Sequence, residues 1–97
     1  MFYNVKSVKP MGNYKLEVCF ENGEKKNYDV GALFEKYEDF RTLASVTGLF
    51  EQVRVDAGGY AVCWNDDLDI ACNELWYNGV VNQTNRGARA PPSIETG

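Results

Sequence analysis

The stretch YKLEVCFENG, residues 14–23, decides the fold because it holds one clear strand and the turn that reverses it. From Tyr14 to Glu21 apolar and polar side chains alternate, the pattern of a strand with one buried face. Asn22-Gly23 tolerates positive φ at both turn positions. The segment from Glu24 to Val30 is therefore expected to fold back as a hairpin partner, with Tyr28 and Val30 inside.

Further strands are expected on both sides of this hairpin. Tyr3 to Lys9 precedes it and is expected to end at the turn Pro10-Met11-Gly12-Asn13. A second hairpin follows, with strands at Gln52–Asp56 and Tyr60–Trp64 around Ala57-Gly58-Gly59. Leu68 to Ala71 adds a brief extended segment.

Helical segments are expected to be few and short. Asp29 is a candidate N-cap for a helix from Ala32 to Tyr37, with apolar side chains at helical spacing. Residues 38–48 are expected to be irregular, with a short turn at Leu49-Phe50-Glu51, and Asn73 to Tyr77 can form one helical turn that ends at Gly79. The sequence therefore predicts an α+β fold, with a small antiparallel sheet of two hairpins plus an N-terminal strand, covered by one or two short helices.

Length and composition indicate one domain. The chain has 97 residues, of which 44% are hydrophobic, and residues 82–97 turn polar and rich in Gly and Pro. We expect a single domain over residues 1–81 and a mobile tail over residues 82–97. The start of the chain lacks a basic segment followed by an apolar run, which predicts a cytoplasmic protein without a membrane span.

Charge argues against direct binding to nucleic acid. The formal net charge is −4, whereas proteins that neutralise phosphates usually carry a basic face. The lysines of the first half alternate with glutamates, which is typical of a mixed solvated surface.

The order of these motifs resembles that of a known family. The segments that carry the resemblance are Val5-Lys6-Ser7-Val8-Lys9-Pro10, Phe20-Glu21-Asn22-Gly23, Phe50 to Asp56, Gly58-Gly59, Trp64, Asp69-Ile70-Ala71 and Glu74-Leu75. Over residues 3 to 77 the chain resembles the bacterial domain of unknown function 2442 family. Members commonly have Pro or Gly after the tryptophan, where this chain has Asn65-Asp66-Asp67.

The resemblance implies a fold more than an activity. Its members are small α+β domains of prokaryotes, sometimes fused to a helix-turn-helix domain. They are often encoded beside another small uncharacterised protein, in an arrangement suspected to be toxin-antitoxin-like. No helix-turn-helix follows Tyr77 here, so direct DNA reading is not implied for this chain.

Residue types weaken the case for catalysis. The chain has no histidine, which removes the commonest general base and metal ligand. The three cysteines have no redox or zinc spacing, and we expect structural free thiols. We therefore expect no catalytic residue and no cofactor.

An acidic cluster supports a different hypothesis. Asp66, Asp67, Asp69 and Glu74 lie close in sequence, with Asp56 across the second hairpin. The spacing fails as an EF-hand loop, because Ile70 stands where Gly is needed. A looser oxygen-ligand site for magnesium or calcium is the alternative, but a solvated acidic turn explains the same residues, so no metal is predicted. A small-molecule-binding or carboxylate-based enzymatic domain built on Asp56, Asp67 and Asp69 stays open as the alternative function.

The leading hypothesis is a non-enzymatic protein-interaction module. An apolar cluster closes the expected domain, and Trp and Tyr are favoured interface anchors. The candidate partner surface consists of Leu75, Trp76, Tyr77, Val80 and Val81. Eight other aromatic residues are expected in the core, namely Tyr14, Phe20, Tyr28, Phe34, Tyr37, Phe50, Tyr60 and Trp64. The partner is expected to be a protein, encoded nearby, and open sheet edges would also allow a second copy of the chain to pair.

Overall fold

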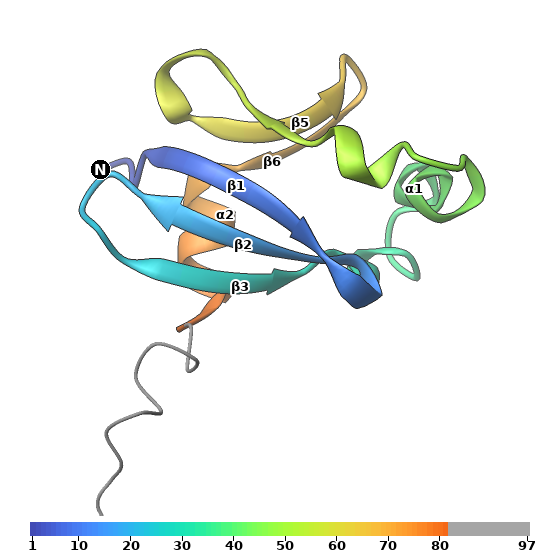
Figure 1. Cartoon of the computed structure of the whole chain (residues 1–97), viewed down its shortest axis with the longest axis horizontal. Coiled ribbons are helices and arrows are strands. Elements are labelled where there is room, and N and C mark those ends of the chain that lie inside the picture. Colours follow the sequence, from blue (N-terminus) through green and yellow to red (C-terminus); the bar gives the residue numbers. More distant parts are fainter. Residues whose placement is uncertain (82–97) are drawn as a thin grey trace, which may run out of the picture.

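The structure is a computed structural model in which residues 1–81 are described. These residues form two antiparallel sheets and two short α-helices, so the predicted α+β class is confirmed (Figure 1). The first sheet has the strand order β1-β2-β3-β7 and the second β4-β5-β6. The sequence predicted one sheet for these strands, whereas the structure divides them between two.

The first sheet is built around the hairpin predicted from residues 14–23. Its strands are β1 (Val5–Met11), β2 (Lys15–Phe20), β3 (Lys25–Asp29) and β7 (Val80–Val81). Leu16 pairs with Tyr28 across the hairpin. In the connection only Gly23 has positive φ, at +91°, and the backbone N–H of Phe20 donates to the carbonyl of Glu24. The turn is therefore a three-residue connection closed by glycine, not a two-residue turn with positive φ throughout.

The second sheet matches the second predicted hairpin and the extended segment after it. Its strands are β4 (Arg54–Val55), β5 (Ala61–Asn65) and β6 (Leu68–Ala71). The turn between β4 and β5 lies directly against β1, since a Cβ on Gly59 would stand 2.6 Å from the carbonyl oxygen of Val5. A side chain at position 59 would force the two sheets apart at this contact.

The helical segments are short, and two of them lie within residues 38–48, where an irregular connection was predicted. The α-helices are α1 (Thr42–Ser45) and α2 (Cys72–Asn78), and short 3-10 turns cover Gly12–Tyr14, Val30–Leu33, Glu38–Arg41, Phe50–Gln52 and Ala57–Gly59. In place of a helix to Tyr37 there is the Val30–Leu33 turn, followed by a single turn in which the backbone N–H of Tyr37 donates to the carbonyl of Leu33. The Asp29 side chain makes no capping hydrogen bond there. None of the helices in residues 1–81 has the length and apolar character that crossing a membrane requires.

Two details at the start of the fold correct the sequence analysis. β1 continues through Pro10 to Met11, which is possible because β1 is an edge strand and needs no hydrogen bond from the proline nitrogen. Tyr14 belongs to a turn, with φ +56°, and its ring packs against Phe34 and Phe50. The tertiary contacts of this ring override the alternating pattern that placed it in a strand.

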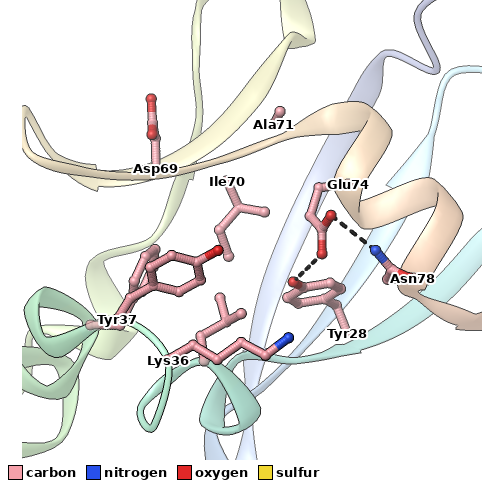
Figure 2. A pocket seen from close by; sticks show the side chains of 10 residues that line it. Tyr28, Lys36, Tyr37, Asp69, Ile70, Ala71, Glu74 and Asn78 are labelled. Carbon is pink, nitrogen blue, oxygen red and sulfur yellow. Dashed lines mark hydrogen bonds between the residues drawn. The ribbon is translucent and has the colours of Figure 1, made fainter.

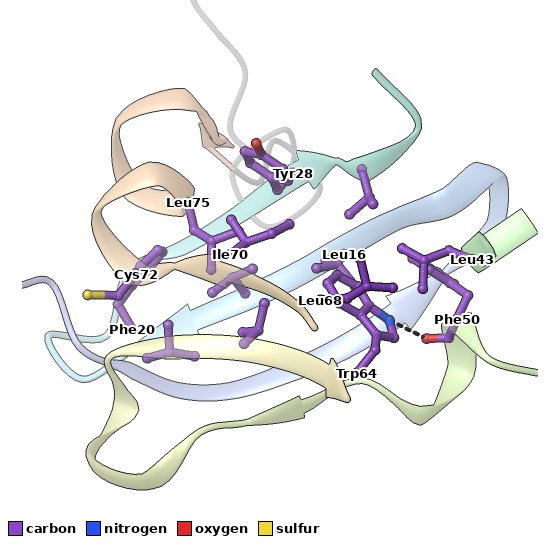
Figure 3. Packing of buried hydrophobic residues seen from close by; sticks show 14 residues of the cluster. Leu16, Phe20, Tyr28, Leu43, Phe50, Trp64, Leu68, Ile70, Cys72 and Leu75 are labelled. Atoms are coloured by element: carbon purple, nitrogen blue, oxygen red, sulfur yellow. Dashed lines mark hydrogen bonds between the residues drawn. The ribbon is translucent and has the colours of Figure 1, made fainter. Parts of the chain in front are cut away.

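The core lies between the two sheets and α2 (Figure 3). Leu16, Phe20 and Tyr28 of the first sheet meet Ile70 of the second and Leu75 of α2 in this cluster. The cluster also includes Trp64, whose indole N–H donates to the carbonyl of Phe50 at 3.0 Å. Tyr37 and Tyr60, expected inside, are instead 55% and 52% exposed.

Candidate functional site

An aromatic surface lies where the start of the chain crosses α2. It consists of Phe2, Tyr3, Tyr60, Trp76 and Tyr77. The Tyr3 ring stacks on the Trp76 ring, with centroids 4.1 Å apart and planes at 2°, and it meets the Tyr77 ring edge-on at 5.7 Å. Phe2 meets Tyr60 edge-on at 5.1 Å. Phe2 and Tyr3, neighbours in sequence, therefore each bring a distant part of the chain into a ring contact, with Tyr60 in one case and with Trp76 and Tyr77 of α2 in the other.

Asn73 at the start of α2 holds the first residues against the helix. Its side-chain oxygen accepts from the backbone N–H of Tyr3 at 3.0 Å, and its side-chain nitrogen donates to the carbonyl of Met1 at 2.9 Å. A hydrogen bond with Tyr77 raises the pKa of Tyr3. Asn73 thus holds the backbone of Tyr3, and Tyr77 holds its side chain.

Trp76 is the half-buried centre of the aromatic surface. Its ring meets Phe20 edge-on at 5.0 Å, and the ammonium group of Lys26 lies 4.0 Å from its centroid. The same ammonium donates to the carbonyl of Trp76 at 2.5 Å. Trp76 therefore joins the surface to the core, and its removal would disturb both.

The five residues predicted as a partner surface occupy unlike environments. Leu75 is fully buried at 0% exposure and belongs to the core. Tyr77 and Val80 are 68% and 63% exposed, while Trp76 and Val81 are half-buried. The accessible part of the predicted surface therefore consists of Tyr77 and Val80, and the ring of Tyr3 adjoins Tyr77.

A groove lies on another side of α2, between the helix, β6 and residues 28–40 (Figure 2). Its volume is about 450 Å³. The polar residues that line it are Tyr28, Lys36, Tyr37, Asp69, Glu74 and Asn78, and its apolar lining is Leu33, Phe40, Ile70 and Ala71. Of these, Asp69 directs its carboxylate away from the groove (Figure 2). We call it the Glu74 groove.

Two hydrogen bonds orient the Glu74 carboxylate in this groove. The hydroxyl of Tyr28 donates to Oε2 at 2.8 Å, and the side-chain amide of Asn78 donates to Oε1 at 2.9 Å (Figure 2). Burial raises the pKa of Tyr28, and the hydrogen bond and negative charge of Glu74 raise it further. Tyr28 is thus held as a neutral phenol that donates to Glu74.

The acidic residues singled out from the sequence are spread over the second sheet. Asp69 lines the Glu74 groove, Asp67 lines a separate pocket beside α1, and Asp56 accepts a hydrogen bond from the backbone N–H of Ala57. Within residues 1–81, no three His, Cys, Asp or Glu side chains gather as metal ligands. The three aspartates of the alternative hypothesis therefore do not share one pocket.

The cysteines are free thiols in the described structure, as expected. Cys63 and Cys72 are buried, and Cys19 is half-buried. Cys19 lies in β2, Cys63 in β5 and Cys72 in α2, and Cys72 belongs to the core cluster as a small apolar side chain.

Sequence reasoning missed Phe2 and Tyr3 in the aromatic surface and did not find the Glu74 groove. The adjacent aromatic pair before β1 was an available signal for the surface. No local signal marks the groove, because Tyr28, Tyr37 and Glu74 come from three separate segments.

Comparison with known proteins identifies the family. A family model described as "Protein of unknown function (DUF2442)" matches residues 5–80. No curated protein and no solved structure matches the sequence. Because the family model covers most of the chain, the chain belongs to the DUF2442 family, as its motifs indicated.

Proposed function

We propose that this member of the DUF2442 family is a non-enzymatic protein-interaction module that binds a partner protein through its aromatic surface. The observation that carries the proposal is the exposure of Tyr77, at 68%, beside rings that are held rigidly. Rigid aromatic side chains contribute much of the affinity of protein interfaces because they bury large area at little entropic cost.

Other exposed apolar side chains near the two ends of α2 support a protein partner over a small polar ligand. Val80 is 63% exposed, and Phe2 and Tyr60 are 63% and 52% exposed. Large exposed apolar areas on small domains are a common feature of interaction sites. We infer a partner that covers these side chains with apolar groups of its own.

The family resemblance suggests where this partner is encoded. Members often stand beside another small protein, and we propose a toxin-antitoxin-like pair in which this chain is one member. Any effect on DNA would then arise through the complex, since the net charge of this chain is −4.

The test is affinity purification of the tagged chain from its own cells, followed by mass spectrometry. Tyr77→Ala and Val80→Ser should each lower recovery of a stoichiometric partner at least tenfold. Val46→Ser is the matched control, because Val46 is also an exposed valine, at 50%, but lies far along the chain near α1. Circular dichroism should show that all three variants stay folded.

Two results would overturn the proposal. One is equal recovery of the partner by the Tyr77→Ala, Val80→Ser double variant and by Val46→Ser. The other is the absence of any stoichiometric partner. Recovery only of further copies of this chain would assign the surface to self-association instead.

A second function, small-molecule binding, is supported by the Glu74 groove. Pockets of a few hundred Å³ with an apolar lining and a few oriented polar groups are typical ligand sites. The groove, with a volume of about 450 Å³, combines both features.

A further inference from the structure

The Glu74 carboxylate has unused hydrogen-bonding capacity at a fixed orientation. Each of its oxygens accepts one hydrogen bond, from Tyr28 and Asn78, and a carboxylate offers about four acceptor positions in all. Both donors are neutral groups, so neither cancels the negative charge. A planar cation with two parallel N–H groups could use the remaining positions together.

The rest of the groove suits a cation that is flat and only weakly hydrated. Tyr37 is 55% exposed, and Figure 2 shows its side chain and those of Glu74 and Tyr28 around the same space. Guanidinium groups stack on aromatic rings, whereas ammonium groups are more strongly hydrated and bind as point charges. The apolar lining, including Leu33 and Ile70, would contact the aliphatic stem that carries such a group.

The charged side chains of the groove also bear on the kind of ligand. The oriented carboxylate of Glu74 favours a cation, and the ammonium of Lys36 would compete with that cation. The fixed charge of the groove is the Glu74 carboxylate, which two hydrogen bonds orient, whereas the Asp69 side chain points away from the groove (Figure 2) and Lys36 brings a single ammonium. Lys36 is exposed and its long side chain can turn toward solvent. A bound cation would be repelled by Lys36, whereas a bound anion would need it.

We propose that the Glu74 groove is a binding site for a guanidinium group, which pairs with the Glu74 carboxylate and stacks on Tyr37. The group can come from an arginine side chain of a protein or from a free guanidino compound. This inference does not rest on the aromatic surface, because the two sites share no residue, and either can fail alone.

The experiment is a titration of the ¹⁵N-labelled chain, followed by NMR, with two guanidinium probes. One is agmatine and the other is the peptide acetyl-Gly-Arg-Gly-amide. The same peptide with citrulline in place of arginine has nearly the same shape without the charge. We expect saturable shifts near Lys36, Tyr37 and residues 69–78 with at least one guanidinium probe, and none with the citrulline peptide.

Variants of the groove residues test which side chains hold the guanidinium group. Glu74→Gln should weaken binding at least tenfold and Tyr37→Leu several-fold, while Glu51→Gln, which removes the same charge at an exposed site outside the groove, should change it less than twofold. Lys36→Met should tighten binding a few-fold.

The results distinguish the two sources of the guanidinium group, and some of them would overturn the proposal. Tighter binding of the peptide assigns the groove to a protein arginine, and tighter binding of agmatine assigns it to a free compound. Weaker binding by Lys36→Met, equal shifts with the citrulline peptide, or equal losses in Glu74→Gln and Glu51→Gln would each overturn the proposal. If Glu74→Gln unfolds, Tyr37→Leu carries the same decision, since Tyr37 is exposed and its change should leave the core intact.

Discussion

Helix α2 separates two unlike surfaces within seven residues. On one side Trp76 and Tyr77 meet Tyr3, and ring packing fixes the geometry. On the other side Glu74 and Asn78 face the groove, and hydrogen bonds fix the geometry. A short helix can thus present two differently built surfaces, provided that a third face anchors it in the core through Leu75.

The largest expected effect is on the free energy of unfolding and comes from Leu75, which anchors α2 in the core. Leu75→Ala should lower the free energy of unfolding by about 3 kcal/mol, because it removes a fully buried side chain and leaves a cavity. Tyr77→Ala, two residues away, should change it by less than about 0.5 kcal/mol. Urea unfolding followed by circular dichroism measures both, and similar losses in the two variants would contradict the separation of anchor and surface.

The next effect concerns the groove side of α2, where the contribution of Tyr28 to stability should depend on pH. Tyr28→Phe should cost about 1 to 2 kcal/mol at pH 8, because it removes the hydrogen bond to Glu74. Folding raises the pKa of Tyr28 above its ordinary value of about 10, so its contribution is complete below that pH and is lost as the pH rises further.

The stability gap between wild type and Tyr28→Phe should therefore shrink above about pH 10. Urea midpoints at pH 8 and pH 11 test this, and the ionisation of other tyrosines cancels in the difference. A gap that widens with pH would mean that the Glu74 contact does not favour the neutral phenol.

The smallest effect concerns the aromatic side. Lys26→Met should cost about 0.5 to 1 kcal/mol, because it removes a cation over the Trp76 ring and a donor to the Trp76 carbonyl. Lys25→Met is the matched control, since Lys25 is the exposed neighbour on the opposite face of β3. Equal effects of the two changes in urea unfolding would show that the contact adds nothing measurable to stability.

Those parts of the fold with a local signal could be predicted. Both hairpins follow from the alternation of apolar and polar residues and from the glycines of their turns. The antiparallel pairing of β2 with β3 and of β4 with β5 confirms them. The helix expected from Ala32 failed because its apolar spacing is satisfied by a single 3-10 turn and by the packing of Leu33 and Phe34 on the core. The predicted tail, residues 82–97, lies outside the described residues.

The candidate sites were less predictable because they depend on tertiary arrangement. The sequence places Leu75 and Tyr77 in one apolar cluster, and only the packing of α2 shows that one is buried and the other exposed. The Glu74 groove joins residues 46 positions apart, such as Tyr28 and Glu74, and no pattern along the chain relates them.

The contrasting settings of the two tryptophans make the chain its own spectroscopic reporter. Trp64 lies in the core with its indole N–H bonded to a carbonyl, and Trp76 lies half-buried under a lysine. Intrinsic fluorescence of a Trp64→Phe variant would follow events at the aromatic surface, and that of a Trp76→Phe variant would follow the integrity of the core. Binding of a partner and loss of the fold could then be told apart in the same cuvette without any attached dye.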